Sequence, residues 1–565
     1  MSRPYDADPK GLPLMLSSLE IAQTATLRPI ADVAADAGIE PDELEQYGRY
    51  KAKVDLSILA RLADRPDAKI VNVTAITPTP AGEGKTTTSV SLTQGLGAIG
   101  RRPVLALREA SLGPVFGVKG GAAGGGYAQV VPMEDLNLHF TGDLHAITAA
   151  NNLLAALIDA HLLHGNERGI DPLSISWRRC MDMNDRSLRD VVTGLGGRVN
   201  GYPRQTGFDI TAASEIMGLV AVARDLADLR ERLGRITVGY TYEGEAVTAE
   251  ELKAAGSLAV LLKDAIKPNL VQTLEGQPAF VHCGPFANIA HGNNSLVADR
   301  VALKLGDYLV TESGFASDMG MEKFFDITCR IGGLRPNAVV LVATVRALKH
   351  HGGDIDGGMA HIEGGAANMA RHIGIIRHFG LQAVVGVNKF PTDTPEEIEL
   401  VKRLALEHGA YAAEVNTAFE HGGKGATALA EAVVAAADEP SEFRFAYSYD
   451  APIAEKIRAI AVDVYGADGV FLLKTAKDKA AAFEAAGLGD LPICMAKTHL
   501  SLSHDATLLN APTGFTVTVR DLRPYTGAGW IVALCGDMQT MPGLGKTPAA
   551  HAIDVDADGS IVGLF

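Results

Sequence analysis

Residues 68–88 read Ala68-Lys-Ile-Val-Asn-Val-Thr-Ala-Ile-Thr-Pro-Thr-Pro-Ala-Gly-Glu-Gly-Lys-Thr-Thr-Thr88, and this stretch decides the fold. Its apolar run from Ile70 to Ile76 predicts a buried strand of a parallel sheet. A turn rich in Pro and Gly follows, and the polar residues after it are typical of a helix start. This is the layout of a phosphate-binding loop, because backbone N–H groups at the start of a helix point at phosphate oxygens.

The loop departs from the general pattern G-x-x-x-x-G-K-[ST] at its first position, where this chain has Thr79. The rest of the pattern is intact. In such a loop Lys85 reaches the β- and γ-phosphates and acts catalytically, and the Thr86 hydroxyl ligates Mg²⁺. The alternative is a glycine-rich turn with a capping Thr. We predict that ATP is bound by Thr79, Pro80, Ala81, Gly82, Glu83, Gly84, Lys85 and Thr86.

A second stretch near the C-terminus repeats the spelling Gly-x-Gly-Lys-Thr over residues 543–547 and also follows an apolar run. Here Pro548 comes directly after the Thr and removes an N–H group from the turn that would hold phosphate. No amphipathic helix pattern follows it. We therefore interpret residues 543–547 as a structural loop.

Composition and length limit the function classes. The 565 residues are too many for one core and suggest three or four domain-sized units. The net charge of −16 argues against a nucleic-acid protein, which needs clustered Lys and Arg. The first residues have no apolar signal segment, and no apolar run reaches the ~18 residues that span a bilayer. The five scattered cysteines indicate reduced thiols, so we expect a cytoplasmic protein without a membrane partner.

Apolar strand patterns alternate with helical stretches from residue 67 onward, which predicts an α/β fold. The predicted strands are 70–76, 104–107, 279–282, 308–311, 338–344 and 383–388. We predict a P-loop nucleotide-binding parallel sheet flanked by helices, with an inserted subdomain and a smaller C-terminal α/β domain. The expected divisions are a discontinuous ATP-binding domain (1–120 and 225–380), the inserted subdomain (121–224) and the C-terminal portion (381–565).

Charged residues beside the loop suggest further chemistry. Arg108 ends the second strand, where an Arg can hold a planar oxyanion with two parallel hydrogen bonds. The alternative is an ion pair between Arg108 and Glu109 or another acid. The acidic residues 134, 135 and 143 flank two histidines, but these spacings fit no common zinc pattern, and Asp143 suits the start of a helix.

These residues together predict ATP, Mg²⁺ and a small anionic co-substrate. Longer stretches also resemble one family, formate–tetrahydrofolate ligase (formyltetrahydrofolate synthetase), and the resemblance runs from about residue 16 to 565. In that family the loop itself carries Thr in place of the first Gly. The resemblance rests on residues 79–86, Leu107-Arg-Glu-Ala-Ser-Leu-Gly-Pro114, 119–135, Asn137-Leu-His-Phe-Thr-Gly-Asp143, Gly284-Pro-Phe-Ala-Asn-Ile-Ala-His-Gly292, Pro391-Thr-Asp-Thr394 and Asn510-Ala-Pro-Thr-Gly-Phe-Thr-Val-Thr-Val519.

The resemblance implies a three-step reaction. Formate attacks the γ-phosphate of Mg-ATP to give formyl phosphate and ADP, the N10 amine of tetrahydrofolate attacks the formyl carbon, and phosphate leaves 10-formyltetrahydrofolate. It also implies that Lys85 grips the transferring phosphoryl group and Arg108 the formyl phosphate. Gly320 lies close to that intermediate and Phe315 lines its pocket. The charges of Lys85, Mg²⁺ and Arg108 suit the negative transition states.

The resemblance assigns folate binding and assembly to the C-terminal portion, with tetrahydrofolate between two aromatic rings. One ring matches Phe390, and Phe419 stands where the family usually has Trp, so a smaller ring is retained. Asp143 is a further folate contact by resemblance. Asn388-Lys389 also resembles the Asn-Lys-x-Asp motif that reads guanine, but Pro391 replaces the Asp, so guanine selectivity is not expected.

The resemblance further implies a homotetramer activated by a monovalent cation, whose ligands the sequence does not assign. The competing interpretation is a partner-regulated P-loop ATPase that acts as a switch or a metal-insertion chaperone. Such a protein would share the loop, but it would need neither the second glycine-rich segment nor the aromatic pair.

Overall fold

The computed structural model describes residues 16–80, 82–118, 123–536 and 538–564. Its centre is a large sheet whose strands run in the order β1-β2-β13-β14-β4-β15-β3-β16-β17-β18, with β5 and β6 attached beside β13. From β14 to β18 all neighbouring strands are parallel. These strands are β1 (Leu44–Gln46), β2 (Ala52–Val54), β3 (Lys69–Ala75), β4 (Pro103–Leu107), β5 (Gly124–Gly125), β6 (Ala128–Val131), β13 (Asn269–Thr273), β14 (Pro278–Val281), β15 (Tyr308–Glu312), β16 (Ala338–Ala343), β17 (Gln382–Asn388) and β18 (Ala412–Asn416).

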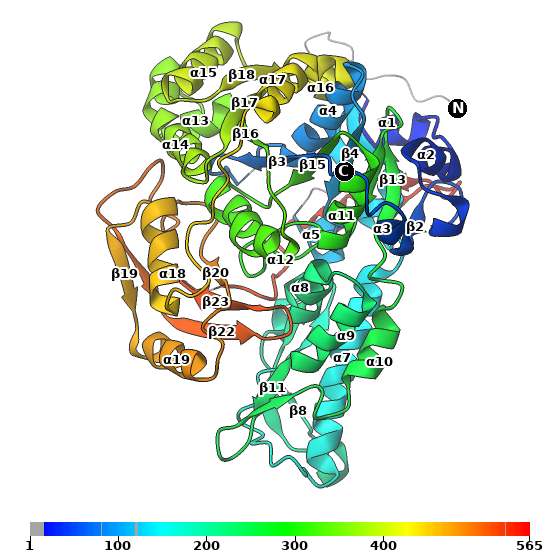
Figure 1. The fold of residues 1–565 in the computed structure, drawn as a ribbon, viewed down its shortest axis with the longest axis vertical. Helices are drawn as coiled ribbons and strands as arrows, with labels where there is room; N and C mark the ends of the chain where they lie inside the picture. The colour runs from blue at the N-terminus through cyan, green and yellow to red at the C-terminus, as the bar shows by residue number, and fades with distance from the viewer. Residues whose placement is uncertain (1–15, 81, 119–122, 537, 565) are drawn as a thin grey trace.

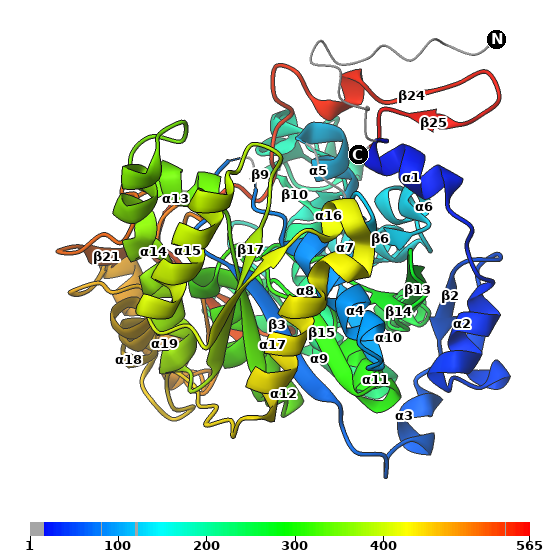
Figure 2. The ribbon, with the colours of Figure 1, turned by 90° about the horizontal axis from the view of Figure 1, so that it is seen from above.

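Helices cover both faces of this sheet, which explains why its parallel strands are continuous apolar runs (Figures 1 and 2). Val71 and Val73 of β3 pack in one core with α4 and α17, whereas Ile70 packs in another core with α11 and α14. The predicted α/β class and the six predicted strands are confirmed. The helices around the sheet are α1 (Ser18–Thr24), α2 (Ile30–Ala37), α3 (Ser57–Arg61), α4 (Lys85–Ala98), α5 (Leu112–Gly117), α6 (Met133–Asn137), α11 (Leu296–Leu305), α12 (Arg330–Gly332), α13 (Val345–His351), α14 (Met359–His378), α15 (Pro395–Glu407), α16 (Ala418–His421) and α17 (Thr427–Asp438).

A helical lobe projects from the sheet (Figure 1), and its apolar core continues into the C-terminal strands that carry Cys494 and Trp530. It leaves the sheet where α7 begins at Asp143 and returns at β13, so it covers roughly residues 143–266. The expected subdomain, 121–224, therefore overlaps it but begins among the sheet strands β5 and β6 and stops before α9 and α10. The lobe contains α7 (Asp143–Leu163), α8 (Glu215–Val222), α9 (Leu226–Arg235), α10 (Ala255–Leu262), β7 (Arg179–Met181), β8 (Val191–Thr193), β9 (Arg204–Thr206), β10 (Phe208–Ile210), β11 (Thr237–Tyr240) and β12 (Ala246–Thr248).

The C-terminal part forms two small sheets, β19-β21 and β20-β23-β22, with α18 and α19 packed on them. The expected boundary at 381 falls inside the large sheet, because β17 and β18 continue it and Gln382 pairs in register with Ala338. The hairpin β24–β25 lies beside α1 (Figure 2), and the Gln23 side chain donates to the Ile561 carbonyl at 3.0 Å. These elements are α18 (Ile453–Ala459), β19 (Gly469–Leu472), α19 (Lys474–Ala485), β20 (Ile493–Ala496), β21 (Thr516–Val519), β22 (Asp521–Tyr525), β23 (Trp530–Leu534), β24 (Asp554–Val555) and β25 (Ile561–Val562).

Among the described residues, one helix, α7, is long and apolar enough to cross a membrane by length and composition alone. The core helix of a globular protein passes the same test. Leu154, Ile158 and Leu162 of α7 are buried in the core of the lobe, where they pack against the other lobe helices. All five cysteines are buried and free.

A buried ion pair fastens the lobe to the sheet. Lys53 of β2 donates to both carboxylate oxygens of Asp143, at 2.8 and 3.0 Å, and to the side-chain oxygen of Asn269 in β13. The side chains of Lys53 and Asp143 are 1% and 3% exposed. A buried charge is tolerated only when it is paired and hydrogen-bonded, so each of these residues depends on the other.

We predict that Lys53→Met destabilises the protein by about 3–5 kcal/mol, because Asp143 then remains as an unpaired buried charge. The measurement is the thermal unfolding midpoint of the full chain. Lys474→Met is the matched control, because the Lys474–Asp478 ion pair lies on the surface and should contribute little. An unchanged midpoint for Lys53→Met would show that the pair does not hold the lobe in place.

Candidate active site

The loop between β3 and α4 lies at the carboxyl edge of the parallel strands, where ligands bind in open α/β sheets. Gly82 and Gly84 adopt φ values of +76° and +74°, which residues with a side chain rarely adopt. Gly84 precedes α4 without a side-chain cap, so the first N–H groups of that 14-residue helix receive no capping side chain. Ala81, which was predicted in this loop, lies outside the described residues.

A cavity of about 420 Å³, here called the loop cavity, opens beside this loop. The side chains of Lys85 and Thr86 line it together with Arg108, which comes from the end of β4. The structure thus brings the predicted catalytic and metal-ligating residues to one place. Its other lining residues include Thr79, Pro80, Gly82, Glu83, Glu109, Gly284, Phe286, Glu312, Phe315 and His499.

Two cationic side chains, Lys85 and Arg108, lie close to the Glu312 carboxylate in the loop cavity. Burial lowers the pKa of the Lys85 ammonium, and the nearby Glu312 carboxylate opposes that shift. The Arg108 Nη2 atom lies 3.4 Å from a Glu312 oxygen, while its buried Nε has no partner in the described part of the chain. The acid beside Arg108 is therefore Glu312, and the guanidinium retains a donor for a ligand.

Glu83 turns its side chain inward and organises the loop. One carboxylate oxygen accepts from the backbone N–H and the hydroxyl of Thr79, at 2.8 and 2.7 Å. The other oxygen accepts from the Thr344 hydroxyl at 2.5 Å, just after β16, and lies 3.4 Å from Arg346 Nε. Thr79, in place of the usual Gly, thus supplies a hydroxyl that closes the loop onto Glu83.

Asn388, at the end of β17, holds the loop from the opposite side. Its side-chain N–H group donates to the carbonyls of Glu83 and Gly84, at 2.8 and 3.2 Å. Its oxygen accepts from the Thr88 hydroxyl and from Asn416. The Asn of the Asn388-Lys389 pair therefore anchors the loop between β3 and α4 through its side-chain amide.

A second cavity of about 730 Å³, here called the aromatic cavity, shares Pro80 and Gly82 with the first. Phe390 and Phe419 both line it, as do Gly124 and Gly125. The Phe419 side chain is 40% exposed, so it is not a core residue. The structure thus brings the two predicted folate aromatics to one cavity beside the loop. The remaining lining residues are Ser18, Gly84, Thr87, Val118, Arg346, Asn388, Lys389, Pro391, Asn416 and Glu420.

Arg346 connects the two cavities. Its guanidinium stacks on the Phe390 ring, 4.3 Å from the centroid, and also donates to the carbonyl of Gly82. A cation over an aromatic face is attracted by the ring's quadrupole, whose face is negative. The ring in one cavity and the loop in the other are therefore held by the same side chain.

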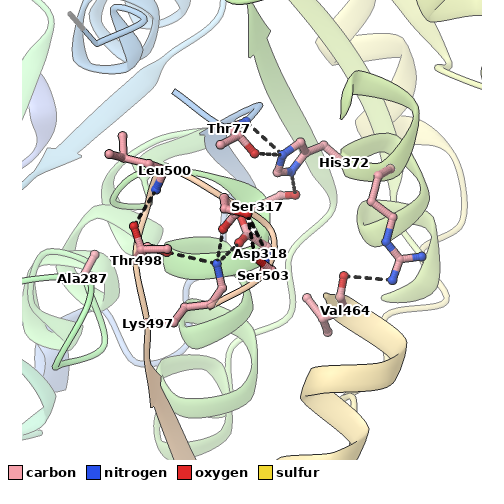
Figure 3. A network of polar contacts seen from close by, with 12 residues as sticks. Thr77, Ala287, Ser317, Asp318, His372, Val464, Lys497, Thr498, Leu500 and Ser503 are labelled. Carbon is pink, nitrogen blue, oxygen red and sulfur yellow. Dashed lines mark hydrogen bonds and ion pairs between the residues drawn. The ribbon is translucent and has the colours of Figure 1, made fainter. Parts of the chain in front are cut away.

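The beginning of the loop is fixed by a buried polar network (Figure 3). The N–H of Thr77 donates to Nε2 of His372 at 2.9 Å, so that nitrogen is unprotonated and Nδ1 donates to Ser317 at 2.7 Å. Burial lowers the pKa of His372 to about 4, which keeps the ring neutral. The neighbouring Asp318 accepts from Lys497 at 2.7 Å, which joins the C-terminal unit to this network.

The residues predicted around formyl phosphate differ in their roles. Phe315 lines the loop cavity at φ +62° and stacks on His499, with ring centroids 4.2 Å apart. Gly320 does not line it. A Cβ there would lie 2.1 Å from the carbonyl oxygen of Gly314, so this glycine permits the turn that carries Phe315.

Asp143 lies away from the aromatic cavity. Its buried carboxylate accepts from Lys53 and Asn269, and it lines neither cavity among the described residues. Together with burial, its charge raises the pKa of Glu109 well above the ordinary value. We therefore leave Asp143 out of the proposed folate site.

Other sequence predictions fall elsewhere. Residues 119–122 of the second glycine-rich segment lie outside the described part of the chain. The repeated motif at 543–547 is followed by a short 3₁₀ turn, Ala549–His551, and the hairpin β24–β25, with no α-helix among the described residues up to 564. Within the described ranges no group of three His, Cys, Asp or Glu side chains is placed to hold a metal.

Three residues that line the cavities were not predicted from the sequence, namely Glu312, Arg346 and His499. Glu312 directly follows the predicted strand 308–311, and that position was the available signal. Arg346 and His499 follow strands far along the chain and carry no local pattern. Arg346 is brought to the loop by the place of β16 next to β3 in the large sheet, and His499 by the packing of the C-terminal unit, where it stacks on Phe315.

Known proteins resemble this chain over nearly its full length. The family model described as formate–tetrahydrofolate ligase matches residues 16–565. The formate–tetrahydrofolate ligase of Cutibacterium acnes is 56% identical over 98% of this chain and 100% of its own length. Those of Desulforamulus reducens and Saccharopolyspora erythraea are 54% and 55% identical, each over 97% of this chain and 99% of their own length. The chain therefore belongs to the formate–tetrahydrofolate ligase family.

Proposed function

We propose that the protein joins formate to tetrahydrofolate at the expense of ATP, giving 10-formyltetrahydrofolate, ADP and phosphate through formyl phosphate. The observation that carries this proposal is the convergence of Lys85, Thr86 and Arg108 on one cavity, next to a second cavity lined by two aromatic rings. Family membership supports the choice of substrates, and the residues that line the two cavities suit phosphate in one and a flat ring in the other.

In this proposal residues 79–86 form the phosphate-binding loop of an ATP-binding sheet. The uncapped start of α4 and the Lys85 ammonium hold the phosphates. The Thr86 hydroxyl and the Glu312 carboxylate present only oxygen, the donor that Mg²⁺ prefers, so the residues fit this ion. Bound there, Mg²⁺ would neutralise phosphate charge during transfer.

The first step activates formate. Formate is a poor acyl donor because its leaving group would be oxide, and phosphorylation replaces that with phosphate. A formate oxygen attacks the γ-phosphorus, the bond to the β-phosphate oxygen breaks, and ADP leaves. Lys85 and Arg108 stabilise the charge on the transferring group, since both line the loop cavity. Phe315 covers one side of this space.

In the second step the N10 amine attacks the formyl carbon, phosphate leaves, and the amine loses its proton. Phe390 and Phe419 would hold the flat pterin of tetrahydrofolate between their rings. The cavity that they line adjoins the loop cavity, because Pro80 and Gly82 line both. This proximity supports reaction between a group formed in one cavity and a substrate held in the other.

The oligomeric state, the cellular location and the cation requirement of the enzyme are also proposals. We infer a cytoplasmic homotetramer activated by a monovalent cation, and the support for all three is resemblance to the family. We also infer that the sheet around β3 is the ATP-binding domain and that folate binding and assembly involve the chain after residue 380.

Isotope-labelled formate tests the reaction directly. One oxygen of ¹⁸O-formate should appear in phosphate, and only when ATP, formate and tetrahydrofolate are all present, because formyl phosphate passes that oxygen to the leaving group. The measurement is mass spectrometry of phosphate with each substrate omitted in turn. A switch-type ATPase would take its oxygen from water, and unlabelled phosphate from the complete reaction would exclude the formyl phosphate route.

Lys85→Ala should lower turnover by at least ~10²-fold without unfolding the protein, because a donor that stabilises transition-state charge is lost. Steady-state kinetics with all three substrates provide the measurement. The matched control is Lys546→Ala, in the exposed repeated spelling, which should retain normal turnover. Equal losses in the two variants would contradict the assignment of the loop.

Phe419→Ala should raise the tetrahydrofolate KM several-fold and leave the ATP KM nearly unchanged, because stacking contributes on the order of 1 kcal/mol. Phe419→Trp should retain activity. Phe471→Ala, which removes another exposed ring on β19, is the control and should change neither constant. A Phe419→Ala enzyme with normal KM values would remove this ring from the folate site.

A further inference from the structure

Glu312 is buried at the centre of the site, although neither the motif nor the family resemblance gave it a role. It ends β15, the strand next to β3, and it pairs in register with Val73. Its carboxylate therefore reaches the edge of the sheet from which the loop departs. The residue is only 2% exposed, and a carboxylate buried this deeply requires a reason.

Its contacts supply that reason. The Thr86 hydroxyl donates to Glu312 Oε2 at 2.8 Å, and Arg108 Nη2 lies 3.4 Å from Oε1. The same negative charge acts on the pKa of Lys85. In the proposed function Lys85 and Arg108 hold phosphate and Thr86 holds the metal. The Glu312 carboxylate contacts Thr86 and Arg108 and acts electrostatically on Lys85.

The direction of the Thr86 bond matters chemically. A Thr hydroxyl has one hydrogen, and when Glu312 accepts it the oxygen lone pairs remain free for a cation. Mg²⁺ is usually bound through one or two carboxylates and the substrate phosphates, and outer partners that fix a ligand's orientation are important for affinity. In P-loop NTPases an acid at a neighbouring strand end works with the loop Ser or Thr in this way.

We propose that Glu312 is the acidic residue of the Mg²⁺ site. It acts as a positioning residue that orients the Thr86 hydroxyl and supplies negative charge for the cation. This inference rests on the proposed function, because it requires that the loop bind Mg-ATP. The simpler role, an ion-pair partner that only holds Arg108, makes a different prediction about metal dependence.

The test measures nucleotide affinity with and without the metal, so it does not depend on turnover. Isothermal titration of the full chain with the non-hydrolysable analogue β,γ-imido-ATP is done in millimolar Mg²⁺ and again in EDTA. Wild-type protein should bind more tightly with Mg²⁺. Glu312→Gln keeps the size and an acceptor oxygen but removes the charge, and it should lose on the order of 10–100-fold of this Mg²⁺-dependent gain.

Thr86→Val probes the same hydrogen bond from its other end and keeps the shape of the side chain. It should lose a similar part of the Mg²⁺-dependent gain, and the double variant should lose less than the sum, because the two residues act as a unit. If Glu312→Gln does not fold, Thr86→Val decides the question. Unchanged Mg²⁺ dependence in that variant would overturn the inference.

Two controls separate this role from simpler ones. Glu215→Gln alters another buried Glu, which accepts from the N–H groups of Gly527 and Ala528 outside both cavities, and it should behave like wild type. Arg108→Ala should leave the Mg²⁺ dependence unchanged. If Glu312→Gln does the same, Glu312 only holds Arg108 and the inference is wrong, while the proposed function stands. Absence of nucleotide binding by wild-type protein would instead refute the proposed function.

Discussion

The buried carboxylate of Glu83 is the constraint on which the site depends. It is 3% exposed, and it accepts hydrogen bonds from Thr79 at one end of the loop and from Thr344 beyond β16. Hydrogen bonds to a charged group contribute about 1.5–3 kcal/mol each, and a buried carboxylate without them would be very unfavourable. These hydrogen bonds therefore fix Thr79 and Glu83 relative to Thr344. Groups that are already held in place do not have to be ordered when the phosphates bind, which favours both affinity and catalysis.

Residues of this loop line both cavities, and other side chains connect the loop to the aromatic cavity. Arg346 contacts the loop at Gly82 and stacks on Phe390, while Asn388 donates to the carbonyls of Glu83 and Gly84 and lines the aromatic cavity. A shift of the loop would therefore alter the position of the ring. In the proposed reaction, the group formed in the loop cavity reacts with a substrate in the aromatic cavity, so this shared loop fixes their relative placement.

The C-terminal unit contributes to the same framework through a buried ion pair (Figure 3). The Lys497 ammonium has three acceptors, Asp318 and the carbonyls of Thr498 and Ser501, so all its hydrogens are used. The side chains of the pair are 0% and 4% exposed, and such a pair is tolerated because its hydrogen bonds are complete. Next to Asp318, Ser317 holds His372, and His372 holds the beginning of the loop at Thr77. The C-terminal unit thus helps to hold the start of the loop in place, although it contributes few of the residues that line the two cavities.

The sequence by itself determined the α/β class, the six strands and the position of the loop, because strand periodicity and glycine-rich turns are local signals. The strands β13 and β18 were not predicted, because the assignment of a strand to a sheet is a long-range property. For the same reason the expected boundaries of the lobe and of the C-terminal portion do not coincide with those of the folded units. The roles of Glu83, Glu312 and Asn388 were likewise decided by tertiary structure. Their contacts join residues far apart in the chain, with separations of 261 for Glu83 and Thr344, 226 for Thr86 and Glu312, and 305 for Asn388 and Glu83. Only the parallel strand order brings these side chains to one edge, where each buried polar or charged group meets the hydrogen-bond partner that its burial requires.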